Sequence, residues 1–130
     1  MENKHKKTIL IVDDTKPIRI LLLKKLEKQY RCLLSSDPAE AVSLYREYID
    51  EVDLIISDYE MPGMNGSEFL KRIVRLNKTV PVIMVSASLN HQRIQNLLRL
   101  GVRKFVAKPV RINLLLKYVE EIMKDDADEM

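Results

Sequence analysis

The sequence predicts an α/β fold in which helices cover both faces of a mostly parallel sheet. Three observations lead to this prediction. Short aliphatic runs alternate with longer stretches of helical spacing, five such pairs follow one another, and the runs are apolar at nearly every position. Strands that are apolar throughout are typical of parallel sheets, whose crossover helices bury both faces.

The predicted strands are five short segments rich in Val, Ile and Leu. In a parallel sheet, right-handed crossovers connect such strands, and ligands bind at their carboxyl ends. We expect functional residues where these segments end. The strands are predicted over Thr8–Val12, Arg31–Ser35, Asp53–Ser57, Pro81–Val85 and Arg103–Ala107.

The intervening helices carry start and stop signals. Pro17 suits the first turn of the first helix, and Asp37 before Pro38 predicts an N-cap for the second. Asn65 opens the third helix, and Gly101 ends the fourth. The apolar positions that share a helical face are Ala41, Val42, Tyr45, Tyr48, Ile49, Phe69, Leu70, Ile73, Ile94, Leu97, Leu98, Leu114, Leu115, Tyr118, Val119 and Ile122.

Length and composition indicate one domain with charged ends. The chain has 130 residues, of which 46% are hydrophobic and 32% charged. We divide it into a basic arm (1–7), the domain (8–124) and an acidic tail (125–130). The net charge of +3 is too small to argue for nucleic acid. The single cysteine, Cys32, suits a reducing cytosol, and no apolar run approaches the roughly 18–20 residues of a membrane span, so we expect a cytoplasmic protein.

Chemistry-bearing residues follow four of the predicted strands. Asp13 and Asp14 end the first, Asp58 the third, Ser86 the fourth and Lys108 the fifth. Because the carboxyl ends of parallel strands share one edge of the sheet, these residues are expected to lie together. Each is weak evidence alone, since Ser86 is an ordinary strand-end serine and Lys108 could be a surface lysine.

The acids predict a magnesium site. Adjacent carboxylates repel each other, and a divalent cation relieves that repulsion. Oxygen ligands without matching His or Cys suit Mg²⁺ better than zinc. Beside Mg²⁺, Asp58 can act as a nucleophile toward phosphorus, with Lys108 and Ser86 stabilising the transferring group. The alternative is an acidic helix N-terminus formed by Asp13 and Asp14.

The motifs Val12-Asp13-Asp14, Asp58, Met61–Gly66, Ser86-Ala87 and Lys108-Pro109 resemble the response-regulator receiver domain over about residues 7–124. This resemblance implies a flavodoxin-like, doubly wound sheet of five parallel strands in the order 2-1-3-4-5, with five helices. It also implies a signalling switch of a two-component system and not an enzyme that turns over an external substrate.

The resemblance implies a role for each site residue. Asp58 looks like the phosphoacceptor, and Ser86 and Lys108 look like the phosphoryl contacts. The Lys108–Pro109 bond is expected to be cis. Phe105 looks like the aromatic switch residue that acts with Ser86, although it could be a plain core aromatic. The Mg²⁺ ligands are expected to be Asp13, Asp14, Asp58 and the backbone carbonyl of Glu60.

Two variable positions flank this site. Glu60 lies two residues after Asp58, and Ser88 lies two residues after Ser86. In the family that the chain resembles, such positions modulate the lifetime of the phosphoryl group. A negative charge at Glu60 could repel the phosphodonor or order an attacking water.

The expected partners follow from the resemblance. A histidine kinase or histidine phosphotransfer protein would supply the phosphoryl group. The surface of helix 4, strand 5 and helix 5, around residues 90–122, would then change and control a downstream protein. This surface carries basic residues, which could instead form a solvated face; they are Arg93, Arg99, Arg103 and Lys104.

Two other functions remain open from the residues. A Mg²⁺-dependent phosphatase-like enzyme would also use a strand-end Asp, but the adjacent Asp13 and Asp14 are not its usual spacing. A phosphorylation-independent interaction module need not keep the whole set of acids, serine and lysine. Direct nucleic-acid binding is not expected, because the chain lacks a separate DNA-binding domain and an aromatic-basic platform.

Overall fold

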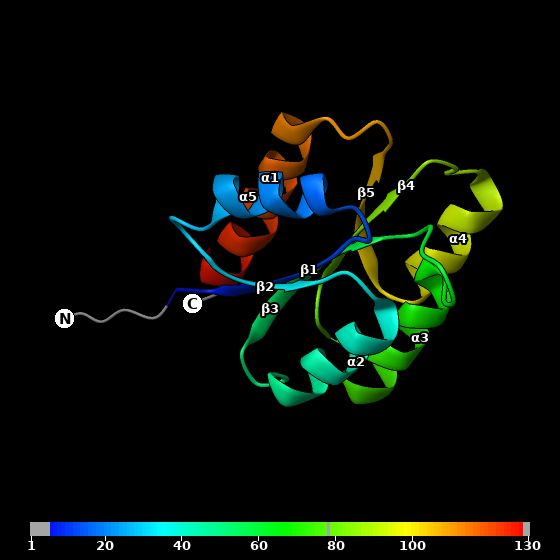
Figure 1. The fold of residues 1–130 in the computed structure, drawn as a ribbon, viewed down its shortest axis with the longest axis horizontal. Coiled ribbons are helices and arrows are strands. Elements are labelled where there is room, and N and C mark those ends of the chain that lie inside the picture. The colour runs from blue at the N-terminus through cyan, green and yellow to red at the C-terminus, as the bar shows by residue number, and fades with distance from the viewer. Residues whose placement is uncertain (1–5, 78, 129–130) are drawn as a thin grey trace.

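The structure, a computed structural model, describes residues 6–77 and 79–128, with side chains described through residue 124. Its five strands form one sheet in the order β2-β1-β3-β4-β5, and each neighbouring pair is parallel. Figure 1 shows the sheet between two layers of helices. The predicted fold class and strand order are therefore confirmed.

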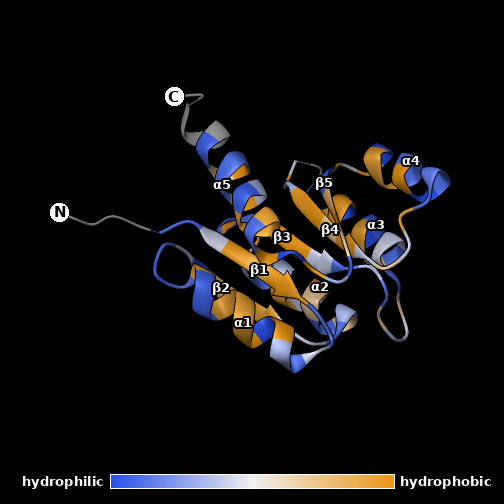
Figure 2. Ribbon diagram, turned by 90° about the horizontal axis from the view of Figure 1, so that it is seen from above, coloured by the Kyte–Doolittle hydropathy of each residue, from blue (hydrophilic) through white to orange (hydrophobic). Residues whose placement is uncertain are grey.

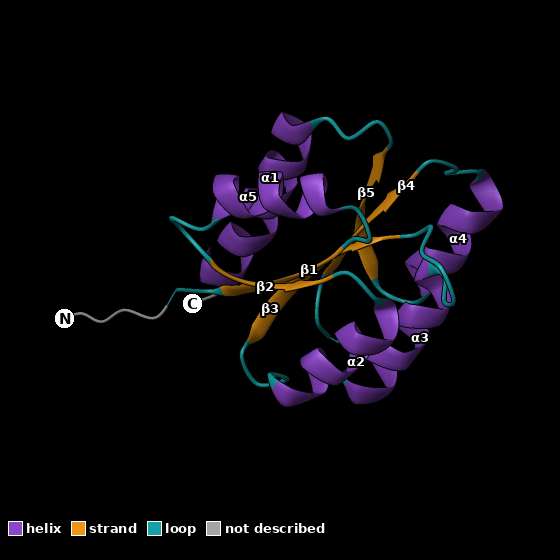
Figure 3. Cartoon of the chain, viewed as in Figure 1, coloured by secondary structure: helices purple, strands orange, loops and turns teal. Residues whose placement is uncertain are grey.

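Strands and helices alternate along the described chain, as the sequence predicts (Figure 3). The elements are β1 (Thr8–Val12), α1 (Lys16–Leu26), β2 (Arg31–Ser35), α2 (Pro38–Glu47), β3 (Val52–Asp58), α3 (Gly66–Leu76), β4 (Val82–Ser86), α4 (His91–Arg99), β5 (Val102–Ala107) and α5 (Ile112–Asp128).

The continuous apolar strands are explained by two separate cores. Ile9 and Ile11 of β1 pack in the core under α1 and α5. Leu10 and Val12 of the same strand pack in the core under α2, α3 and α4. Successive side chains of a strand point to opposite faces, so the four positions of β1 after Thr8 are all apolar. Figure 2 shows largely apolar strands between helices that carry both apolar and polar residues.

The helices begin at the predicted signals. Pro17 lies in the first turn of α1. The Asp37 side chain accepts a hydrogen bond from the Glu40 backbone N–H at 2.9 Å. Asn65 forms a reciprocal capping box with Glu68 at the start of α3. These caps satisfy backbone donors that a helix leaves without an intrahelical partner.

Some details differ from the sequence prediction. Leu98 is 48% exposed, although Leu97 is fully buried. Successive helical residues lie about 100° apart, and α4 buries only a narrow stripe. α5 continues to Asp128, into the predicted tail, while residues 1–5 of the predicted arm and residues 129–130 lie outside the described residues. Among the described helices, none has the length and apolarity needed to cross a membrane.

Candidate functional site

The carboxyl edge of the sheet gathers the predicted site residues. Asp13 and Asp14 directly follow β1, Asp58 is the last residue of β3, Ser86 is the last of β4, and Lys108 directly follows β5. Because β1, β3, β4 and β5 are consecutive neighbours in the sheet, these ends form one continuous edge. Chain crossovers thus bring together residues that are nearly a hundred positions apart.

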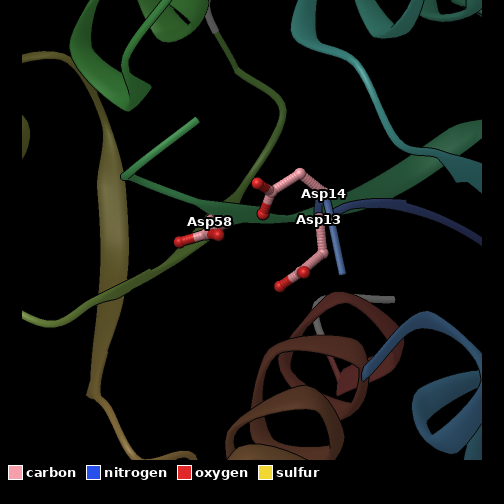
Figure 4. Close-up of side chains that lie close together, drawn as sticks. All are labelled: Asp13, Asp14 and Asp58. Atoms are coloured by element: carbon pink, nitrogen blue, oxygen red, sulfur yellow. The ribbon is translucent and has the colours of Figure 1, made fainter. Parts of the chain in front are cut away.

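Three carboxylates form a cluster at this edge. Asp13, Asp14 and Asp58 each offer an oxygen, and these oxygens all lie within 4.8 Å of one another. Figure 4 shows the three side chains grouped where β1 and β3 end. Asp13 and Asp58 are buried, whereas Asp14 is exposed. The cluster contains only hard oxygen ligands, which fits the predicted Mg²⁺ site.

Local hydrogen bonds fix the orientation of Asp13. Its Oδ1 accepts from the Thr15 backbone N–H at 2.8 Å and from the Thr15 hydroxyl at 2.5 Å. The Asp13 backbone carbonyl accepts from Arg19 at 2.7 Å. The loop between β1 and α1 is therefore tied to the first turn of α1. One carboxylate oxygen of Asp13 lies within 4.8 Å of an oxygen of Asp58.

Asp58 is buried next to a positive charge. It is 2% exposed, and its Oδ1 lies 2.7 Å from the ammonium Nζ of Lys108. Burial raises the pKa of Asp58, because desolvation disfavours its charged form; the contact with Lys108 offsets only part of this effect. The negative charge of Asp13 raises the pKa of Asp58 further.

Lys108 is held between two acids. Burial alone would lower its pKa, but contacts with Asp58 and Glu60 keep the pKa of Lys108 above its ordinary value. Its Nζ lies 3.4 Å from Oε1 of Glu60, in addition to the contact with Asp58. The Lys108–Pro109 bond is cis, the geometry implied by the resemblance. Lys108 therefore carries a fixed positive charge at the mouth of the site.

The side chain of Glu60 reaches across the site to the end of β4. Its Oε2 accepts from the Ser86 hydroxyl at 2.6 Å, and its Oε1 accepts from the Ala87 backbone N–H at 3.1 Å. Burial alone would raise the pKa of Glu60, but the bonds from Ser86 and Ala87 and the charge of Lys108 lower it overall. Sequence reasoning placed Glu60 near the site but gave no partner for its carboxylate.

Arg93 belongs to the site, which the sequence did not indicate. Its Nη1 donates to the Ser88 carbonyl at 2.8 Å and lies 3.3 Å from Oε2 of Glu60. The guanidinium also stacks over the Tyr59 ring, 3.8 Å from its centre. From the sequence, Arg93 is expected only on a basic surface together with Arg99, Arg103 and Lys104. Arg93 lies in the first turn of α4, and its backbone N–H donates to the side chain of Asn90, the N-cap of this helix, at 2.8 Å.

Phe105 lies on β5. It is half-buried and packs against the core under α2, α3 and α4. Ser88 contributes its backbone groups: its N–H donates to the Ser86 hydroxyl at 3.0 Å and its carbonyl accepts from Arg93. Ser86 is therefore bonded to both the Glu60 side chain and the loop that follows β4.

Comparison with known proteins gives a consistent result for nearly the whole chain. The sequence model of the response regulator receiver domain matches residues 9–120. The two-component response regulator ORR24 of rice (Oryza sativa subsp. indica) is 32% identical over 118 residues, which cover 91% of this chain and 19% of that protein. A protein-glutamate methylesterase/protein-glutamine glutaminase of Burkholderia thailandensis is 40% identical over 106 residues, covering 78% of this chain and 29% of that protein.

The fold has close solved counterparts. The structure of a CheX–CheY–BeF₃–Mg²⁺ complex from Borrelia burgdorferi contains a chain that superposes with a TM-score of 0.83 at 27% identity. That match covers 92% of this chain and 90% of the other. By contrast, this chain spans less than a third of either curated relative described above. The similarity therefore concerns one domain of those longer proteins.

Proposed function

Since the chain belongs to the response regulator receiver domain family, we propose that it is a phosphorylation switch in which Asp58 accepts a phosphoryl group. Receiver domains are signalling switches of two-component systems, and this chain keeps their strand order and acid cluster. The observation that carries the proposal is the buried Asp58 carboxylate, 2.7 Å from Lys108 and beside Asp13 and Asp14.

The proposed reaction transfers a phosphoryl group from a phosphohistidine. An oxygen of Asp58 forms a bond to phosphorus while the phosphorus–nitrogen bond breaks, and its electron pair returns to the ring nitrogen. The product is an acyl phosphate on Asp58. Lys108 offers a compact positive charge to the phosphoryl oxygens, and the Ser86 hydroxyl offers a hydrogen bond. These two groups already lie at the ends of β4 and β5.

Receiver domains bind Mg²⁺ at an acid cluster, and the cluster of this chain fits that ion. We propose Asp13, Asp14, Asp58 and the backbone carbonyl of Glu60 as its ligands. When bound there, Mg²⁺ would supply positive charge that offsets the carboxylates and the negative charge of the transferring group. The exposed Asp14 would give the ion an entrance from solvent toward the buried Asp13 and Asp58.

Receiver domains interact with histidine kinases and with downstream targets, and we propose both kinds of partner here. The Borrelia burgdorferi structure is a complex of CheY with another protein, CheX. The output surface proposed for this chain comprises α4, β5 and α5. Phe105 would respond there by packing alone, since it has no hydroxyl to anchor an inward position. We propose the cytoplasm as the location, where a histidine kinase can reach the site.

The number of phosphoryl groups added per chain distinguishes a phosphorylation switch from an enzyme and from an interaction module. Incubation with phosphoramidate and Mg²⁺ should add one phosphoryl group per chain, measured by intact-protein mass. A small phosphate ester should not be turned over. Sustained ester hydrolysis would instead favour the phosphatase-like enzyme, and complete absence of labelling would favour the phosphorylation-independent module.

Mg²⁺ should raise the thermal stability of the protein through the acid cluster. A ligand present at a hundred times its Kd adds about 2.7 kcal/mol to the free energy of unfolding. Asp13→Asn removes one charge but retains an oxygen to accept from Thr15, so most of the Mg²⁺-induced rise in Tm should disappear. Thermal unfolding with and without Mg²⁺ measures this effect. Asp50→Asn, an equal charge change at an exposed residue, serves as the control. An unchanged Mg²⁺ effect in Asp13→Asn would contradict the ligand assignment.

A further inference from the structure

The Glu60 carboxylate binds three donors that surround Asp58. Its Oε2 accepts from the Ser86 hydroxyl at 2.6 Å. Its Oε1 accepts from the Ala87 backbone N–H at 3.1 Å and lies 3.4 Å from Nζ of Lys108. These donors come from the ends of β4 and β5, whereas Glu60 follows β3. The carboxylate therefore bridges three neighbouring strand ends of the sheet.

A phosphoryl group on Asp58 would need the same donors. Ser86 and Lys108 are the contacts that the proposed function assigns to its oxygens. A serine hydroxyl has a single proton, and the backbone N–H of Ala87 has one as well. Neither donor can form a strong hydrogen bond with Glu60 and with a phosphoryl oxygen at the same time. The ammonium of Lys108 already contacts both Asp58 and Glu60.

Arg93 keeps Glu60 in this position. Its Nη1 lies 3.3 Å from Oε2 of Glu60 and donates to the Ser88 carbonyl at 2.8 Å. Stacking on the Tyr59 ring further restricts the guanidinium. Tyr59 directly precedes Glu60, so one arginine from α4 contacts two adjacent residues of the loop after β3. Arg93 therefore holds the Glu60 carboxylate both directly and through the neighbouring Tyr59 ring.

We propose that Glu60 is an internal competitor of the phosphoryl group at this site. This inference deepens the proposed function and rests on it. In the unphosphorylated protein, the Glu60 carboxylate satisfies Ser86, Ala87 and Lys108. After transfer to Asp58, the phosphoryl oxygens take these donors only when Glu60 has released them. The free energy that holds Glu60 in place opposes phosphorylation and sets a threshold for the switch.

Affinity for a phosphoryl analogue tests this competition. The probe is beryllium fluoride in the presence of Mg²⁺, titrated by fluorine NMR into the whole chain. Glu60→Ala removes the competing carboxylate and leaves the backbone carbonyl intact. Hydrogen bonds to charged groups contribute strongly to stability. Loss of the Glu60 carboxylate should therefore lower the half-saturating concentration of beryllium fluoride by about tenfold. Glu60→Gln keeps an uncharged acceptor, so its half-saturating concentration should lie between those of the wild type and Glu60→Ala.

Two controls separate direct competition from simple charge repulsion. Glu47→Gln makes an equal charge change at an exposed position near the end of α2 and should leave the affinity unchanged. In about 1 M salt, the Debye length falls to roughly 3 Å, so repulsion through solvent is screened but direct contacts are not. The advantage of Glu60→Ala should persist in this salt. In the unliganded protein, the Ala87 amide signal should also shift in Glu60→Ala.

The outcomes distinguish this inference from the function on which it rests. Equal affinities of the wild type and Glu60→Ala would overturn the competition alone. Loss of the difference in high salt would also overturn it, in favour of repulsion. If neither protein bound the probe, the proposed phosphorylation at Asp58 would itself fail, and the competition would fail with it.

Discussion

Lys108→Ala is expected to slow phosphorylation of Asp58 by about 10²–10³-fold, the usual cost of removing one donor from a preorganised charge-stabilising site. The ammonium Nζ of Lys108 lies 2.7 Å from Oδ1 of Asp58. Its loss leaves negative charge on the transferring group without compensation from β5. Initial rates of labelling by phosphoramidate and Mg²⁺ measure the effect.

The control for this variant is another lysine of β5. Lys104 pairs with Glu121 at 3.3 Å, away from the acids, so Lys104→Ala changes the net charge equally and should retain the wild-type rate. Lys108→Arg retains the charge on a larger, planar group and should recover only part of the rate. A wild-type rate in Lys108→Ala would show that this lysine has no part in phosphoryl transfer.

Gly66→Ala is expected to cause a large loss of stability. A Cβ at this position would lie 2.7 Å from Cδ2 of Tyr59, 2.9 Å from Sδ of Met84 and 2.9 Å from the Tyr59 Cα. The flexible side chain of Met84 can adjust, but a shift of the Tyr59 backbone would displace the adjacent site residues Asp58 and Glu60. Overpacking of this kind costs about 1–3 kcal/mol, which outweighs a helix-propensity gain of about 1 kcal/mol.

Urea unfolding of Gly66→Ala should therefore show a free energy of unfolding about 1–2 kcal/mol below that of the wild type. Gly63→Ala offers a comparison without a clash, because nothing lies within 4 Å of its Cβ, although its φ of +84° disfavours alanine. Its loss should be near 1 kcal/mol. A Gly66→Ala protein as stable as the wild type would contradict the close packing between α3 and Tyr59.

The fold could be predicted from the sequence because local signals and burial agree. Continuous apolar strands such as β1 require two covered faces, and the structure provides a separate core on each face. Asp37 and Asn65 set helix starts through their own side chains, which need no distant partner. The strand order was supplied by the resemblance, since the alternation of elements alone permits several orders.

The exposure of single helical residues was less predictable. Leu97 and Leu98 are equally apolar, but only Leu97 is buried. Which of two adjacent leucines faces the sheet depends on where α4 crosses its edge, and that position is set by packing. The acid cluster was predictable because strand ends of a parallel sheet always meet at one edge.

The contacts of Glu60 and Arg93 could not be predicted. Their side chains meet across 33 positions of sequence. Whether Glu60 turns toward solvent or toward Ser86 depends on the path of the loop after β3 and on the first turn of α4. Neither path leaves a periodic pattern in the sequence. The sequence shows the charge of Glu60, but the effect of that charge on the site depends on its contacts with Ser86, Ala87 and Lys108.

Asp58 is proposed to be the only acceptor of the phosphoryl group. Intact-protein mass after treatment with phosphoramidate and Mg²⁺ tests it most directly, with Asp58→Asn compared with Asp50→Asn, an equal charge change at an exposed residue. The wild type and Asp50→Asn should each gain one phosphoryl group per chain, and Asp58→Asn should gain none. Undiminished labelling of Asp58→Asn would contradict the assignment of this residue.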